Sequence, residues 1–184
     1  MKGIVFTEFL ELVEIKFGIG MVDTILNESE LPSNGVYTAV GTYSFSEMVS
    51  LLTNLSKETG LAIDELLLVY GEHFFGVVKE SYPTFISQYS DPIEMLSSIE
   101  NHIHVEVRKI YPKAELPTFT ILEKSDERLV MIYKSSRAMH AFGRGLMNKT
   151  FEHFNVKATI LVEKLKENGT EVKFSISAHG KLQN

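Results

Sequence analysis

The spacing of apolar residues changes close to Pro117 in this chain of 184 residues. Before that point apolar residues recur every three or four positions, which is the period of an amphipathic helix. After it they alternate with polar residues, for example over residues 157–163, which is the period of a half-buried strand. A chain with helices first and a small antiparallel sheet afterwards belongs to the α+β class.

Several helix boundaries carry their own signals. Ser44 followed by Glu47 predicts a capping box, in which the hydroxyl accepts a backbone N–H and the carboxylate reaches back to the helix start. Asp91 and Pro92 supply an N-cap and a first-turn proline for a helix that we expect to continue to Ile110. The predicted helices cover residues 6–17, 21–26, 44–59, 64–79 and 92–110, with a loop at 28–43.

The second part of the chain is expected to form a sheet that carries one helix. Asn168-Gly169 is a strong signal for a hairpin turn between the last two strands. The predicted strands cover residues 119–123, 129–135, 157–163 and 173–178, and the predicted helix covers residues 137–154.

Composition removes several classes of function. The chain has 24 acidic and 18 basic residues, a net charge of −6, which argues against general affinity for nucleic acid. It has no cysteine, so thiolate zinc sites, iron–sulfur clusters and thiol nucleophiles are excluded. No stretch reaches the roughly 18 apolar residues of a membrane span, and acidic residues interrupt the first 17 positions where an export signal would be apolar. We therefore expect a cytoplasmic protein with no membrane partner.

Two histidines attract attention as metal ligands. His102 and His104 are separated by one residue, but on a helix this spacing turns the two side chains roughly 160° apart. We therefore do not expect them to share a metal. Each flanks the apolar stripe of its helix, so either one is a candidate single ligand or a surface histidine with no role, and periodicity does not choose between them.

A second candidate site is the pattern Tyr133-x-Ser135-x-Arg137. In an extended segment these three side chains fall on one face, where two hydroxyls and a guanidinium would suit a carboxylate or a phosphate. The same residues would also be ordinary on a solvated edge strand. We find no nucleophile–base pair at a recognisable spacing, and Gly143-Arg144-Gly145 lacks the other features of a phosphate loop.

Taken together and in this order, His104, Tyr111-Pro112, Pro117 and the Tyr133-x-Ser135-x-Arg137 pattern resemble the H-NOX family. These are haem domains that bind nitric oxide or oxygen and are related to the haem domain of soluble guanylate cyclase. The start Met1-Lys2-Gly3 is also similar to that family. The resemblance covers essentially the whole chain and implies one H-NOX-like domain, with a distal helical subdomain at 1–62 and a proximal subdomain at 63–184. It implies haem between the helical half and a four-stranded antiparallel sheet.

The resemblance also implies a role for each site residue. The cofactor would be non-covalent haem b, with His104 as the axial ligand of the iron. Tyr133, Ser135 and Arg137 match the positions that bind the haem propionates, and Pro117 matches the proline that presses on the haem. The positions that match the haem-contacting distal pocket are Val5, Phe9, Phe74, Val78, Phe142 and Leu146.

The implied function is that of a gas sensor and not of an enzyme. Oxygen-binding relatives carry a tyrosine where this chain has Phe142, so we expect nitric oxide and carbon monoxide as ligands and no stable oxygen complex. Nitric oxide would break the iron–His104 bond, and a separate protein would respond to the resulting movement. In the family such output partners are histidine kinases or cyclic-dinucleotide enzymes.

Two other classes remain open from the residues alone. One is a binding module without haem, in which Arg137 and its neighbours hold another anionic ligand. The other is a hydrolytic or metal-dependent enzyme that uses the scattered histidines and carboxylates. An intense Soret band would distinguish a haem protein from both.

Overall fold

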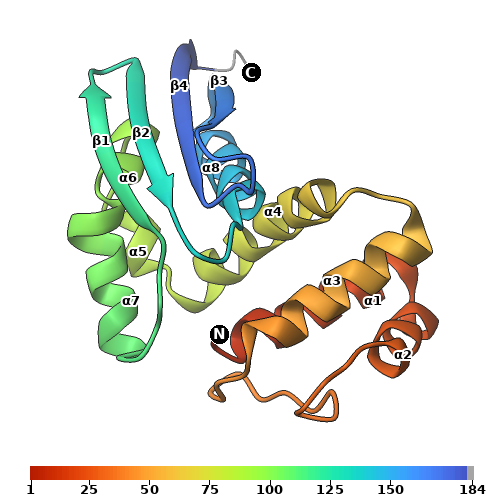
Figure 1. Ribbon diagram of the computed structural model, residues 1–184. Helices are drawn as coiled ribbons and strands as arrows, with labels where there is room; N and C mark the ends of the chain where they lie inside the picture. The colour runs from red at the N-terminus through yellow and green to blue at the C-terminus, as the bar shows by residue number, and fades with distance from the viewer. Residues whose placement is uncertain (182–184) are drawn as a thin grey trace.

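The computed structural model describes residues 1–181. The first helices lie at one end, the sheet with further helices packed beside it lies at the other, and a long helix lies between them (Figure 1). This confirms the α+β class. The elements in chain order are α1 (Ile4–Phe17), α2 (Ile19–Glu28), α3 (Phe45–Thr59), α4 (Ile63–Ser81), α5 (Thr84–Ser87), α6 (Pro92–Ser97), the π-helical turn η1 (Ile99–Ile103), α7 (His104–Ile110), β1 (Thr118–Lys124), β2 (Arg128–Lys134), α8 (His140–His153), β3 (Val156–Lys164) and β4 (Glu171–Lys181).

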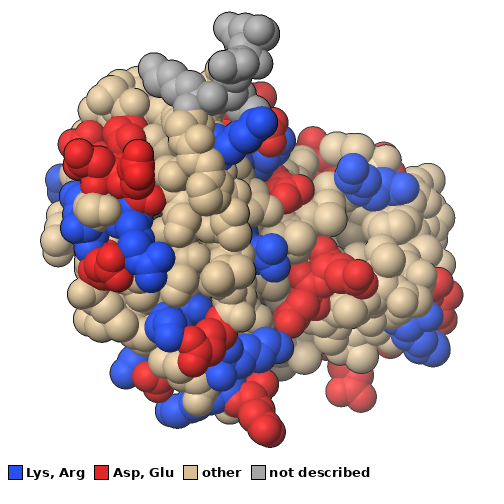
Figure 2. All heavy atoms as spheres, turned by 90° about the horizontal axis from the view of Figure 1, so that it is seen from above, with Lys and Arg blue, Asp and Glu red and all other residues tan. Residues whose placement is uncertain are grey.

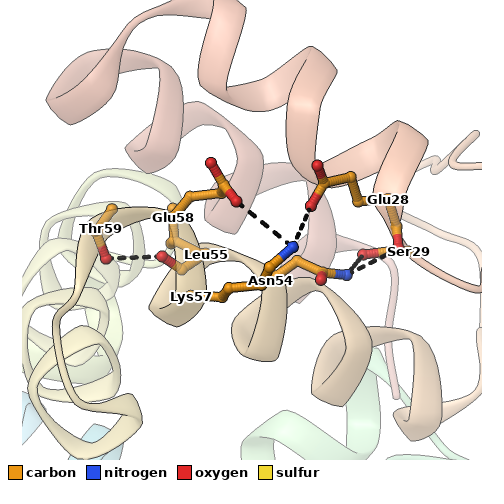
Figure 3. Close-up of polar contacts among 7 residues, drawn as sticks. All are labelled: Glu28, Ser29, Asn54, Leu55, Lys57, Glu58 and Thr59. Carbon is orange, nitrogen blue, oxygen red and sulfur yellow. Dashed lines mark hydrogen bonds and ion pairs between the residues drawn. The ribbon is translucent and has the colours of Figure 1, made fainter.

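Helices α1, α2 and α3 share an apolar core with the first half of α4. The fully buried side chains at its centre are Phe6, Phe9, Ile25, Met48, Leu51, Leu55 and Tyr70. At the rim, the amide of Asn54 donates to the carbonyl of Glu28 at 3.0 Å and to the hydroxyl of Ser29 at 2.9 Å, which fastens the end of α2 to α3 (Figure 3). Lys57 adds an exposed ion pair with Glu28 at 3.3 Å.

The predicted capping box at Ser44 is only half correct. The hydroxyl of Ser44 accepts the backbone N–H of Ser46 at 3.2 Å, as an N-cap should. The carboxylate of Glu47 does not reach back to residue 44. It is buried, and it accepts hydrogen bonds from the hydroxyl of Tyr37 at 2.9 Å and from the hydroxyl of Ser33. Glu47 therefore holds the loop that precedes α3 rather than the first turn of the helix, because that loop offers two hydroxyl donors.

The four strands form an antiparallel sheet, as predicted, and their order in it is β1-β2-β4-β3. Every second residue of β2 faces the core, opposite every second residue of β4: Leu129 pairs with Ile176, Met131 with Phe174 and Tyr133 with Val172. Met147 and Phe151 of α8 join this core, so α8 covers one face of the sheet. Tyr133 is thereby placed at the end of the buried row, close to the rim of the sheet.

Helices α4 and α8 cross in close contact. A Cβ atom at Gly145 would lie 2.2 Å from the carbonyl oxygen of Leu68, and one at Gly71 would lie 2.1 Å from the carbonyl oxygen of Phe142. Both distances are far below van der Waals contact, so both positions need glycine for the observed approach of the two backbones. This crossing joins the helical half of the protein to the sheet half.

The long helix predicted at residues 92–110 is not continuous. It is α6, then η1, then α7, and the backbone N–H of His104 bonds the carbonyl of Ile99, five residues earlier. The extended segment predicted to reach Ser135 also ends earlier, at Lys134. Ser135 bonds the carbonyl of Thr170 through its N–H, and the chain then turns before α8 begins. The predicted division between subdomains at residue 62 stays a prediction, and residues 182–184 of its second part lie outside the described residues.

Candidate functional site

A cavity of about 400 Å³ opens between the helical half and the sheet half of the molecule. Its wall comes from α1, α4, α7 and α8, from the chain before β1 and from the end of β2. Of the residues predicted from the sequence, ten line it: Val5, Phe74, Val78, His104, Pro117, Tyr133, Ser135, Arg137, Phe142 and Leu146. Phe9 does not line it; its ring packs edge-on against Tyr70, with centroids 5.4 Å apart, inside the helical core.

His104 is buried, with only 8% of its surface exposed, at the first residue of α7. Its Nδ1 lies 3.0 Å from Oε1 of Glu100, which leaves Nε2 as the ring nitrogen available for a ligand bond. Burial lowers the pKa of His104, and the nearby carboxylate of Glu100 opposes that shift, so the imidazole is held in its neutral, ligating form.

His102 faces away from His104. Its Nδ1 lies 2.6 Å from the hydroxyl of Tyr89, and it does not line the cavity. The expectation that the two histidines diverge is therefore confirmed. Of the two histidines, His104 lies in the cavity wall and His102 does not.

Arg137 lies at the rim of the cavity, on the turn after β2. Its Nη1 donates to the carbonyl of Glu115 at 2.8 Å, and its Nη2 donates to the carboxylate of Glu115 at 2.5 Å. Its own backbone N–H donates to the hydroxyl of Ser135 at 3.2 Å, which fixes the turn. Three side chains that were expected to share one face of an extended segment therefore meet through a turn instead, with Tyr133 buried and Ser135 and Arg137 half-buried.

Burial raises the pKa of the Tyr133 phenol, and the hydrogen bond with Ser135 and the charge of Arg137 partly oppose this. The phenol therefore keeps its proton at neutral pH and can donate it to an anionic acceptor. The phenol of Tyr133 and the guanidinium of Arg137 make this end of the cavity suitable for a carboxylate. The guanidinium already donates to one there, the carboxylate of Glu115.

The opposite wall is rich in carbon. Phe142 packs against Phe74 and Tyr70, with ring centroids 5.5 Å and 5.0 Å away. The hydroxyl of Tyr70 is fully buried and donates to the carbonyl of Val5 at 2.5 Å. Thr150 also lines the cavity, and its hydroxyl donates to the carbonyl of Leu146 at 2.9 Å. The hydroxyls of Tyr70 and Thr150 are therefore already committed to backbone acceptors.

Sequence reasoning missed the roles of four residues at the cavity, although Tyr111 was part of the pattern that carried the resemblance. Glu100 holds His104, and Glu115 pairs with Arg137. Tyr82 and Tyr111 line the cavity and share a hydrogen bond of 2.9 Å between their hydroxyls. Burial, and after it this hydrogen bond, raises the pKa of Tyr111 to about 12. Glu100 had a usable signal, because a carboxylate four residues before a histidine on a helix lies on the same face.

The side chains of the cavity offer a single metal ligand, which favours a metal that is already bound within a cofactor. One imidazole projects into an apolar cavity, and in residues 1–181 no group of three or more acidic or histidine side chains could hold a metal ion. Haem fits these residues, because its porphyrin supplies four iron ligands, its faces are apolar and its edge carries two carboxylates. No helix within the described residues is long and apolar enough to cross a membrane.

On the face seen in Figure 2, lysine and arginine side chains are interspersed with aspartate and glutamate over both parts of the molecule. The face in view therefore offers no extended surface of one charge.

Comparison with known proteins agrees with the geometry. The sequence model of the haem-NO-binding family matches residues 2–162. No relative was found among curated proteins. A crystal structure of an unliganded Fe(II) H-NOX protein from K. algicida is 66% identical, covers 100% of both chains and has a TM-score of 0.97. A mutant of that protein is 68% identical over 99% of this chain and 98% of its own, also with a TM-score of 0.97.

More distant structures share the fold. The solution structure of an H-NOX protein from Shewanella woodyi, in its Fe(II)CO state, is 35% identical over 100% of this chain and 97% of its own, with a TM-score of 0.82. The crystal structure of an H-NOX protein from S. oneidensis in its Fe(II)NO state is 22% identical over 98% of this chain and 100% of its own, with a TM-score of 0.89.

This fold and this site define a haem-binding gas-sensor domain. The chain belongs to the H-NOX family.

Proposed function

We propose that this protein senses nitric oxide with a non-covalent haem b whose ferrous iron is bound by His104. The observation that carries this proposal is the imidazole of His104, buried against an apolar cavity with Nδ1 engaged and Nε2 available. The neighbouring Fe(II)NO and Fe(II)CO structures of family members support nitric oxide and carbon monoxide as ligand classes.

Arg137, Tyr133 and Ser135 would hold the propionates at the rim of the cavity. The Arg137 guanidinium already binds a carboxylate at this place, and the protonated phenol of Tyr133 adds a donor. Charge-assisted bonds of this kind are needed because an unpaired carboxylate at an apolar cavity would carry a large desolvation cost. Pro117 also lines the cavity and would press on the haem.

The distal wall favours nitric oxide over oxygen. Iron-bound oxygen carries partial negative charge and is stabilised by a hydrogen-bond donor, whereas nitric oxide needs such help much less. Phe142 and Phe74 provide no donor, and the hydroxyl of Tyr70 is turned to the carbonyl of Val5. We therefore expect no stable oxygen complex.

Signalling would begin at the bond between His104 and iron. Binding of nitric oxide would weaken the hold of His104 on the iron, and loss of that hold would release α7 from the cavity. Because His104 is the first residue of α7 and follows the π-helical turn η1, the helix can shift relative to α6 without breaking a regular α-helical ladder. A separate protein, a histidine kinase or a cyclic-dinucleotide enzyme, would bind differently to the two positions of α7 and so respond to the shift.

The test compares His104→Gly with His102→Gly in the purified protein. Wild type and His102→Gly should show a Soret band of histidine-ligated ferrous haem, form a nitric oxide complex, and form no oxygen complex under air. His104→Gly should lose the iron–histidine signal and regain it when free imidazole is added. Wild-type protein without haem, or an unchanged iron–histidine signal in His104→Gly, would refute the proposal.

A further inference from the structure

One carboxylate oxygen joins the imidazole of His104 to the edge of the sheet. Oε1 of Glu100 lies 3.0 Å from Nδ1 of His104 and accepts the backbone N–H of Phe119 at 2.9 Å. Glu100 lies in η1 and Phe119 lies in β1, nineteen residues later in the chain, so the second contact joins two separate elements. The side chain of Glu100 is 27% exposed, which places it between the buried histidine and solvent.

The contact with β1 satisfies a specific need. Strand β1 is at the edge of the sheet and pairs with β2 on one side only. Backbone donors on the other side of an edge strand have no strand partner. Glu100 supplies an acceptor for the donor of Phe119, and the ring of Phe119 lies 6.0 Å from that of His104. The carboxylate is therefore held from two directions and cannot turn away from the imidazole without leaving the Phe119 N–H unpaired.

The contact with His104 fixes which ring nitrogen is free. When Nδ1 carries the proton and donates it to a carboxylate, Nε2 keeps its lone pair and points away from the carboxylate. A carboxylate partner also raises the basicity of a metal-bound imidazole, and loss of such a partner typically costs 10–100-fold in metal affinity.

We infer that Glu100 is a positioning residue for the haem ligand: it orients His104, strengthens its electron donation to iron, and ties its position to edge strand β1. This inference rests on the proposed function, because it takes His104 as the axial ligand. Its consequence is that the iron–histidine bond in this protein is stronger than one made by an imidazole without a carboxylate partner, so the same bond is harder for nitric oxide to break.

Two variants separate charge from contact. Glu100→Gln keeps a side-chain oxygen that can accept from His104 and Phe119 but removes the negative charge, whereas Glu100→Ala removes both. Glu106→Gln is the matched control, because Glu106 follows on α7 and pairs with Lys109 at the surface. The readouts are the iron–histidine stretching band in the resonance Raman spectrum of the unliganded ferrous holoprotein, the Fe(III)/Fe(II) reduction potential, and the rate of haem transfer to excess apomyoglobin.

We expect the stretching frequency to fall and the reduction potential to rise in the order wild type, Glu100→Gln, Glu100→Ala, with Glu106→Gln equal to wild type. Haem transfer from Glu100→Ala should be about 10-fold faster or more. A band and a potential in Glu100→Gln that equal those of wild type would overturn the inference, and this variant decides the question even where Glu100→Ala retains too little haem to measure. Wild-type protein without an iron–histidine band would instead mean that the proposed function has failed.

Discussion

Gly145 lies where helix α8 crosses helix α4, and replacing it with alanine should push the two helices apart. The added methyl group would lie 2.2 Å from the carbonyl oxygen of Leu68, 2.8 Å from the backbone nitrogen of Glu72 and 3.0 Å from the carbonyl carbon of Gly71. All three atoms belong to the backbone of α4, so no side-chain rotation relieves the contact. The helices must separate, or the crossing must tilt.

The size of the effect follows from two opposing contributions. Carbon and oxygen atoms that are not bonded need a separation of about 3.3 Å, so the crossing must open by about 1 Å. Inserting a methyl group into a tightly packed contact costs about 1–3 kcal/mol, whereas replacing glycine by alanine within a helix contributes about 1 kcal/mol in favour of folding. Because the displaced atoms are backbone, we expect the upper part of that range and a net loss of about 1–2 kcal/mol.

Thermal unfolding of the haem-loaded protein, followed by circular dichroism at a fixed haem excess, measures this loss. For a domain of this size, 1 kcal/mol corresponds to about 2–4 °C, so Gly145→Ala should lower Tm by about 2–8 °C. Gly76→Ala is the matched control, because Gly76 also lies in α4 and a Cβ there meets no atom within 4 Å. The control should keep or raise Tm. A Tm for Gly145→Ala at or above that of wild type would refute the argument from the close crossing.

Two further predictions concern buried polar groups. Glu47→Ala removes the acceptor that holds the loop before α3, so the free energy of unfolding should fall by about 2–3 kcal/mol, measured by urea unfolding. Burial lowers the pKa of His140; Asp64, 3.6 Å away, opposes this shift, and the charge of Lys164 adds to it. The unfolded chain therefore binds the proton of this imidazole more tightly than the folded chain does. The stability that depends on neutral His140 is therefore complete above about pH 6.5 and is lost as the pH falls below that value. Unfolding curves between pH 7 and pH 5.5 should show a smaller loss in His140→Gln than in wild type, and equal slopes would contradict this assignment.

Local patterns in the sequence were sufficient for the type and order of the main elements. The helical period before Pro117 and the alternation after it correspond to α1–α7 and to the four strands, because each period reports which face of a single element is buried. The family resemblance, based on a few residues in the right order, identified the family that the comparisons confirm. It also selected residues that the fold brings to one cavity, with Phe9 as the exception.

Those local patterns did not predict which distant segments contact each other. Glu47 was predicted to complete a capping box, but its carboxylate instead accepts a hydrogen bond from Tyr37, in a loop ten residues earlier. The helix expected to continue to Ile110 contains a π-helical turn, and its sequence carries the same apolar spacing that a regular helix would.

The choice between His102 and His104 shows the physical reason most directly. From spacing alone both histidines flank the same apolar stripe, because a helical wheel describes one helix and not its neighbours. The hydroxyl of Tyr89 forms a hydrogen bond with the imidazole of His102. Glu100, which also accepts a backbone N–H of β1, contacts the imidazole of His104 at the cavity. Local periodicity decides which face of an element is buried, but only the packing of separate elements decides which buried group meets which partner.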